Sequence, residues 1–228
     1  MAKVKTNILG NLSGRIGNVS ARIINGITQI AARPASFKIN RSEKAAAARA
    51  VFAATICFTK AILSNPDLKE VWLKAKLKGK YLRSSMFKYN CYFFEDAKPT
   101  VLNVITPDGF SLSVRDVTFN ENSIDINLDE FSSLTSFTTN EVNISFVCLR
   151  AFYNPFNKYK DPIKIIVMTK EIPGFNFKIP FIISFPVNFS QKDLSSLYAN
   201  SIIYLTAITK NAAGETIKCS STYARNIE

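Results

Sequence analysis

The 228-residue chain contains no histidine, which is the side chain most often used as a general acid or base and the commonest metal ligand. Its four cysteines are far apart and form no C-x-x-C pair, so neither a zinc site nor a thioredoxin-like pair is indicated. We expect all four thiols to be free, with Cys57, Cys148 and Cys219 acting as small buried hydrophobic side chains. The missing histidine lowers the expectation of catalysis but does not exclude an enzyme.

The common nucleotide-binding loop motifs, G-x-G-x-x-G and G-x-x-x-x-G-K-[S/T], are also missing, as is the G-x-S-x-G motif of the nucleophile elbow. Asp125, Asp129 and Glu130 could suggest a carboxylate pair or a calcium site, but the solvent-facing side of one strand explains them better. The sequence therefore predicts a protein that is not an enzyme. It predicts no catalytic residue, no metal ligand and no cofactor.

No apolar run resembling a secretory signal follows the N-terminal residues, and no stretch of ~20 apolar residues occurs. We therefore expect no membrane span and a protein made in a cytoplasm. The chain is 47% hydrophobic, which suffices to bury a core.

The net charge of +12 is divided unevenly along the chain. Residues 1–90 hold 17 Lys or Arg against Glu43, Asp67 and Glu70, which gives +14, whereas residues 91–228 carry −2. The first 42 residues contain no acid. Such a split favours two regions with different neighbours.

Residues 1–38 combine this positive charge with nine Ile, Leu and Val between residues 8 and 30 and half of all the glycine. A solvated tail is one interpretation, but such tails are poor in apolar residues. Glycine disfavours a long helix, so we predict an extended or hooked arm that orders against nucleic acid or acidic faces of neighbouring subunits. The predicted partner-binding residues are Lys3, Lys5, Gly10, Gly14, Arg15, Gly17, Arg22, Arg33, Lys38 and Arg41.

Residues 39–97 are predicted to form an antiparallel helical hairpin that packs between subunits. Asn40 and Glu43 suggest a capping box for a first helix over residues 40–64, in which Phe52 and Phe58 lie on two adjacent apolar stripes. Asn65-Pro66 starts a second helix, with apolar residues spaced by 4 and 3 from Leu68 through Trp72 to Phe93. Its basic face is either solvated or faces phosphates, and consists of Lys74, Lys76, Lys78, Lys80, Arg83 and Lys88.

From residue 98 the pattern changes to period two. Ile124, Ile126 and Leu128 alternate with polar residues, as a half-buried strand should. Seven or eight such segments with turns between them predict an antiparallel β-sandwich over residues 98–228, and the last hairpin looks immunoglobulin-like. The predicted fold class is thus α+β: an arm (1–38), a helical hairpin (39–97) and a β-sandwich (98–228).

The N-terminal pattern resembles a family of small proteins from Bacteroidetes bacteria and their phages. The resemblance rests on Lys5, Leu9-Gly10, the segment from Ser13 to Val19, Arg33-Pro34-Ala35 and the following Ala-rich helix. It covers residues 3–65 well and 200–223 loosely, and supplies no catalytic residues. The chain departs from it at Gly10-Asn11, where two glycines are usual, and at Arg22-Ile23, where Trp is usual.

The resemblance implies a virion component of a tailed bacteriophage, made in the host bacterial cytoplasm. In crAss-like phages, ring or neck proteins between portal and tail are of this general kind. Copies of the chain would close a high-order ring by head-to-tail contacts and meet portal, tail or neighbouring ring proteins. The alternatives are a basic DNA-binding architectural protein that contacts nucleic acid without sequence specificity, and a bacterial cytoplasmic binding protein.

Overall fold

The computed structural model describes residues 2–4, 13–32, 36, 39–75, 77, 81–120, 122–131, 135–157 and 159–227. The chain divides into two compact units, Met1–Ala45 and Ala46–Glu228, which we call the N-terminal unit and the body. Each unit is described by itself.

The N-terminal unit is a small antiparallel sheet with the strand order β1-β4-β3-β2. Its strands are β1 (Ala2–Val4), β2 (Gly14–Ile16), β3 (Val19–Ile24) and β4 (Ile27–Ala32). Asn25 and Gly26 form the two-residue turn between β3 and β4 with φ of 52° and 74°, the left-handed geometry that type I′ hairpins require. These residues therefore pair with one another in a sheet, where an extended or hooked arm was predicted.

Helix α1 (Glu43–Ser64) starts just before the body and lies almost wholly in it, followed by α2 (Pro66–Lys74), α3 (Leu82–Asn90) and the 3₁₀-helix η1 (Cys91–Phe93). Asn65 caps α2 as predicted, because its side chain accepts a hydrogen bond from Leu68 N at 3.0 Å. The helix predicted from residue 66 to about 93 is interrupted, since α2 ends at Lys74 and α3 begins at Leu82. The Ser42 hydroxyl accepts a bond from Ala45 N at the start of α1, a role predicted for Asn40.

Two antiparallel sheets follow. The central sheet has the order β11-β10-β7-β8, with β12 also paired to β10, and the second sheet has the order β5-β6-β9. Helix α4 (Phe189–Leu197) connects β9 to β10. The strands are β5 (Val114–Phe119), β6 (Ser123–Leu128), β7 (Asn143–Pro155), β8 (Ile163–Ile172), β9 (Phe181–Pro186), β10 (Tyr198–Lys210), β11 (Thr216–Cys219) and β12 (Tyr223–Ile227).

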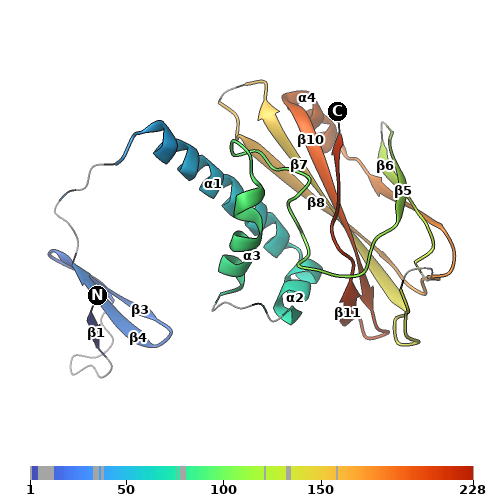
Figure 1. The fold of residues 1–228 in the computed structure, drawn as a ribbon, viewed down its shortest axis with the longest axis horizontal. Helices are drawn as coiled ribbons and strands as arrows, with labels where there is room; N and C mark the ends of the chain where they lie inside the picture. The colour runs from blue at the N-terminus through green and yellow to red at the C-terminus, as the bar shows by residue number, and fades with distance from the viewer. Residues whose placement is uncertain are drawn as a thin grey trace. The chain divides into compact units, whose positions relative to one another are not determined.

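The central sheet is covered on both faces, as Figure 1 shows, with α1 to α3 on one side and β5 and β6 on the other. Alternate residues of β10 serve the two sides: Ile202 and Tyr204 pack with the helices, whereas Ile203 and Leu205 pack with the second sheet. The mixed α/β body is thus layered as helices, sheet and sheet. The helices share a core with their own sheet and do not stand apart as a separate hairpin.

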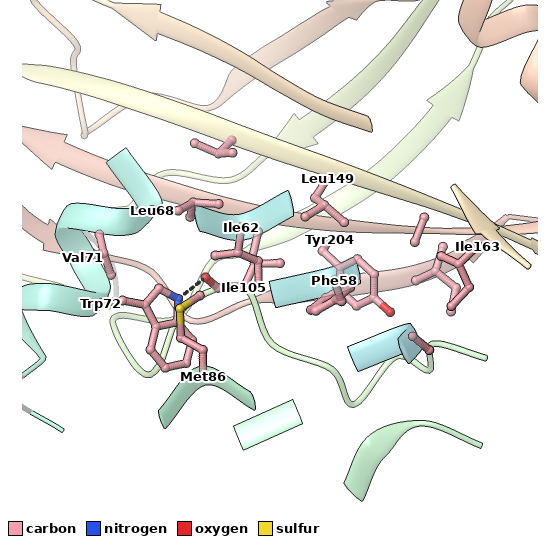
Figure 2. Close-up of a cluster of buried hydrophobic side chains, with 14 of the residues drawn as sticks. Phe58, Ile62, Leu68, Val71, Trp72, Met86, Ile105, Leu149, Ile163 and Tyr204 are labelled. Carbon is pink, nitrogen blue, oxygen red and sulfur yellow. Dashed lines mark hydrogen bonds between the residues drawn. The ribbon is translucent and has the colours of Figure 1, made fainter. Parts of the chain in front are cut away.

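The helix-facing core is built around large side chains that Figure 2 labels. Trp72 is 1% exposed, and its indole Nε1 donates a hydrogen bond to the carbonyl oxygen of Ile105 at 2.8 Å. Phe58 lies edge-on to Tyr204, with ring centroids 5.3 Å apart. Trp72 is therefore buried as its place in the predicted stripe requires.

The other cluster, between the sheets, is rich in phenylalanine. Phe131 contacts the rings of Phe110, Phe137, Phe146 and Phe175 at centroid distances between 5.8 and 6.4 Å. Aromatic side chains bury much area with few rotatable bonds, so this cluster joins the sheets at one place.

Phe52 departs from the prediction for α1. Its side chain is 57% exposed and touches the ring of Phe87 at 5.1 Å, whereas Phe58 and Ile62 on the neighbouring stripe are fully buried. The expectation that this stripe is covered fails at Phe52, whereas Thr59 on the same stripe is buried and Ile56 and Leu63 are half-buried.

Helix α1 is long and apolar enough to cross a membrane by length and composition. In the body, however, its residues Phe58 and Ile62 pack against the central sheet, as those of a core helix do.

Candidate functional site

The strand register of the N-terminal unit separates its residues onto two faces. Residues directly opposite each other in an antiparallel pair lie on the same face, and successive residues alternate. Ala21 pairs with Gly14 and Ile30, whereas Arg22 pairs with Gln29. The described part of the sheet therefore has one aliphatic face and one face with basic residues.

The aliphatic face is partly exposed. Its large side chains Ile16, Val19 and Ile23 are 72%, 40% and 39% exposed, and Ile30 is half-buried. Thr28, on the same face, is buried and only 4% exposed. We call this the apolar face and define it by Ile16, Val19, Ala21, Ile23 and Ile30. The apolar side of such a sheet is normally covered by a second layer.

The opposite, basic face carries Arg15 and Arg22, both exposed. The Arg15 Nε donates to the carbonyl oxygen of Gly17 at 3.3 Å across the β2–β3 turn. Ile24 and Ile27 lie on this face too, next to the Asn25-Gly26 turn.

The other predicted arm residues are distributed as follows. Lys3 takes the register position opposite Gln29 of β4. Gly14 and Gly17 have φ of 125° and 55°, backbone conformations that favour glycine in the strand and turn they occupy. Arg41 is exposed. Lys5, Gly10, Arg33 and Lys38 lie outside the described residues.

The predicted basic helix face is not one continuous surface in the described residues. Lys74 is exposed but paired on the surface of the body, because its Nζ lies 2.7 Å from Glu70 Oε1 and donates to the carbonyl oxygen of Thr216. Arg83 and Lys88 are exposed on α3, while Lys76, Lys78 and Lys80 lie outside the described residues. The interruption between α2 and α3 removes the single helix on which these cations would share a face.

Lys210 is the most buried cation among the ion pairs of the described residues. Its Nζ lies 2.9 Å from Asp67 and 3.2 Å from Glu171, and Ser145 donates to Asp67 at 2.7 Å. Burial would lower the pKa of Lys210, but the two carboxylates outweigh it and raise that pKa. Since Asp67 belongs to α2 and Lys210 to β10, the pair fastens the helices to the sheet.

Glu141 is a second buried charge. Its carboxylate accepts hydrogen bonds from Thr138 N and Oγ1 at 3.0 and 3.1 Å, and Lys218 Nζ lies 3.2 Å away. Burial pushes the pKa of Glu141 up, but bonds from Thr138, Thr209 and Lys218 outweigh it and hold the pKa below 4.5. The contacts with Thr138 and Lys218 all involve Oε1 of Glu141, whereas its Oε2 is buried without a hydrogen-bond partner.

The described residues contain no group of three or more His, Cys, Asp or Glu placed to hold a metal ion. Asp125, weighed as a calcium ligand, accepts hydrogen bonds from Asn120 and Ser123, and Asp129 pairs with Arg115 at 2.6 Å. A hydrogen bond with Ser184 is the main reason why the pKa of Asp125 is lowered.

All four cysteines are free, as expected. Cys148 is buried, and burial raises the pKa of its thiol to about 12. Cys57 is exposed, so its prediction as a buried side chain is wrong, and Cys219 is half-buried.

Comparison of the chain with models of protein families, with curated proteins and with solved structures finds no match.

The sequence analysis did not predict the apolar face, although the sequence contains a signature of the hairpin that forms it. Asn25-Gly26 separates two six-residue apolar-rich runs, which is the strongest short-range signature of a hairpin.

Proposed function

We propose that the protein is a non-enzymatic subunit of a larger assembly, in which the N-terminal unit is the connector. The observation that carries this proposal is the partly exposed apolar face on a unit separate from the body. Covering that face with another protein removes aliphatic area from water, worth roughly 25 cal/mol per Å².

A finer proposal follows from the resemblance of residues 3–65. In this proposal the protein is a structural virion protein of a tailed bacteriophage, which forms a ring or collar at the portal–tail neck. The two sheets of the body would form an immunoglobulin-like sandwich, and the apolar face would dock on a neighbouring subunit. A head-to-tail contact of this kind closes a ring when repeated around an axis. Its partners would be further copies and the portal, tail or neighbouring ring proteins.

Two neighbouring residues of β3 provide a matched test. Ile23→Lys places a charge on the apolar face and should abolish high-order oligomers in sedimentation velocity. Arg22→Gln alters the opposite face and should leave them intact. If Ile23→Lys assembles like the parent chain, the apolar face is not the connector.

The exposed Arg15 and Arg22 favour a second candidate function, a DNA-binding architectural protein. Binding through phosphate contacts falls steeply with salt, with a slope of about −0.9 per neutralised phosphate. The pair Arg15→Gln and Arg22→Gln should then flatten the salt dependence of binding to non-specific duplex DNA. Ile23→Lys should not reduce that binding.

A further inference from the structure

The body contains a pocket of about 410 Å³ between helix α4 and the ends of β5 and β12. Its apolar lining comes from Phe119, Ile124, Val187 and Ile227, and its cations are Arg150 and Lys192. These residues belong to distant parts of the chain and meet only in the folded body. The pocket is independent of the assembly role proposed above.

Arg150, on β7, is held in one orientation. Its Cζ lies 4.5 Å from the ring centroid of Phe152 and 5.9 Å from that of Phe119, so the cation is placed against aromatic rings from both sheets. Its Nε and Nη2 both donate to the Ser201 hydroxyl at 3.2 Å. A guanidinium fixed in this way is organised before any ligand arrives.

Arg150 has no carboxylate partner within the described part of the chain, although the body's other sequestered charges do. Lys210 is paired with Asp67 and Glu171, and Glu141 with Lys218. Burial lowers the pKa of Arg150, but arginine stays protonated at neutral pH. A cation withdrawn from water without a counter-ion is unfavourable, and a bound anion would offset that cost.

Three features of the pocket favour one kind of anion over others. A guanidinium has five N–H donors, and Ser201 takes two of them, so a fork remains that fits the two oxygens of a carboxylate. The remaining walls are mostly aliphatic and aromatic, which suits an apolar group rather than a strongly hydrated phosphate. Lys192, whose Nζ donates to Asn122 at 2.8 Å, adds positive potential without a second fork.

We propose that this pocket binds a carboxylate carried on an apolar group, with Arg150 as its anchor. The same chemistry occurs in a free hydrophobic carboxylic acid and in the α-carboxylate of a polypeptide that ends in apolar residues. Both would place the apolar group against Phe119 and Ile227.

The first experiment titrates the full-length protein with octanoate and, as a neutral control, with 1-octanol. Octanoate should bind and octanol should bind at least about tenfold more weakly, because only the carboxylate meets the guanidinium. Arg150→Met keeps the length of the side chain and should weaken octanoate binding about ten- to a hundredfold. Lys192→Gln should weaken it much less.

Arg150→Met removes an unpaired charge together with its bonds to Ser201 and its contacts with two aromatic rings, so its melting temperature is compared with that of the parent chain. Ser201→Ala retains the cation but frees it from its anchor, and should weaken octanoate binding by about threefold or more. If Arg150→Met does not fold, the Ser201→Ala variant tests the role of Arg150 in its place.

A hexapeptide ending in Phe-Leu, with a free or an amidated terminus, separates the two sources. If the free form binds at least about tenfold tighter than octanoate, the ligand is a polypeptide terminus. If its binding falls short of that threshold, the ligand is a small acid. Equal binding of octanoate and octanol would overturn the proposal. So would unchanged binding in Arg150→Met.

Discussion

At the scale of single residues, the body depends on a few large side chains in its helix-facing core. Trp72→Ala should lower the free energy of unfolding by ~3–5 kcal/mol, because it empties a fully buried site and leaves the Ile105 carbonyl oxygen without its donor. Phe52→Ala, on an exposed side chain, should cost less than ~1 kcal/mol. Urea unfolding of both variants measures the difference, and equal losses would contradict the packing described for α1.

Glu141 makes a pH-dependent contribution. Since its folded-state pKa lies below the ordinary 4.5, the contribution is complete above pH 4.5 and is lost as the pH falls through the folded value. Glu141→Gln should destabilise the body by about 1–2 kcal/mol at neutral pH, mainly through the weakened Thr138 bonds, because Lys218 is partly exposed.

The measurement is urea unfolding of the parent chain and of Glu141→Gln from neutral pH to below pH 4.5, with Glu95→Gln as an exposed control. The difference between parent and Glu141→Gln should shrink on acidification, and Glu95→Gln should match the parent throughout. A difference that is constant with pH would show that the charge of Glu141 is not what matters.

At the scale of elements, the sequence predicted those helices and strands whose conformation is set by interactions between neighbouring residues. Asn65-Pro66 marked the start of α2, and the alternation of residues 123–128 marked β6 with the bounds observed. Phe52 and Phe58 could not be told apart, because both lie on apolar stripes and only the position of the sheet decides which is buried. Helix α4 was missed because it is short and polar, although Asn188 and Gln191 form a capping box.

The Pro107-Asp108-Gly109 turn shows how contact between distant elements gives a residue its role. Gly109 is exposed, yet a Cβ there would lie 2.1 Å from the Cys219 carbonyl oxygen, where Phe110 N bonds to that oxygen at 3.0 Å. Gly109→Ala should therefore destabilise the body by about 2–3 kcal/mol, because backbone would have to move. Asp108→Ala, its neighbour, should cost less than ~1 kcal/mol. Thermal or urea unfolding measures both, and a neutral Gly109→Ala would refute this close approach.

At the scale of the whole molecule, the charge changes at about residue 90, whereas the two compact units divide at Ala45–Ala46, so the charge asymmetry does not mark the division between them. The helices within residues 39–97 pack their buried stripe on the central sheet. The carboxylate pocket could not be predicted, because Phe119, Arg150 and Ile227 are brought together only by the pairing of distant strands. The apolar face could have been predicted from the Asn25-Gly26 turn.

The central claim is that the N-terminal unit connects subunits while the body folds without it. Deleting residues 1–38 leaves the whole of α1, so the shortened protein should unfold with the same midpoint as the body of the parent chain.

Sedimentation velocity of the parent and shortened proteins, supported by electron micrographs of both, tests the claim most directly. The account predicts a discrete high-order oligomer for the parent chain and a folded monomer for the shortened one. A shortened protein that forms the same oligomer, or a parent chain that stays monomeric at high concentration, would contradict it.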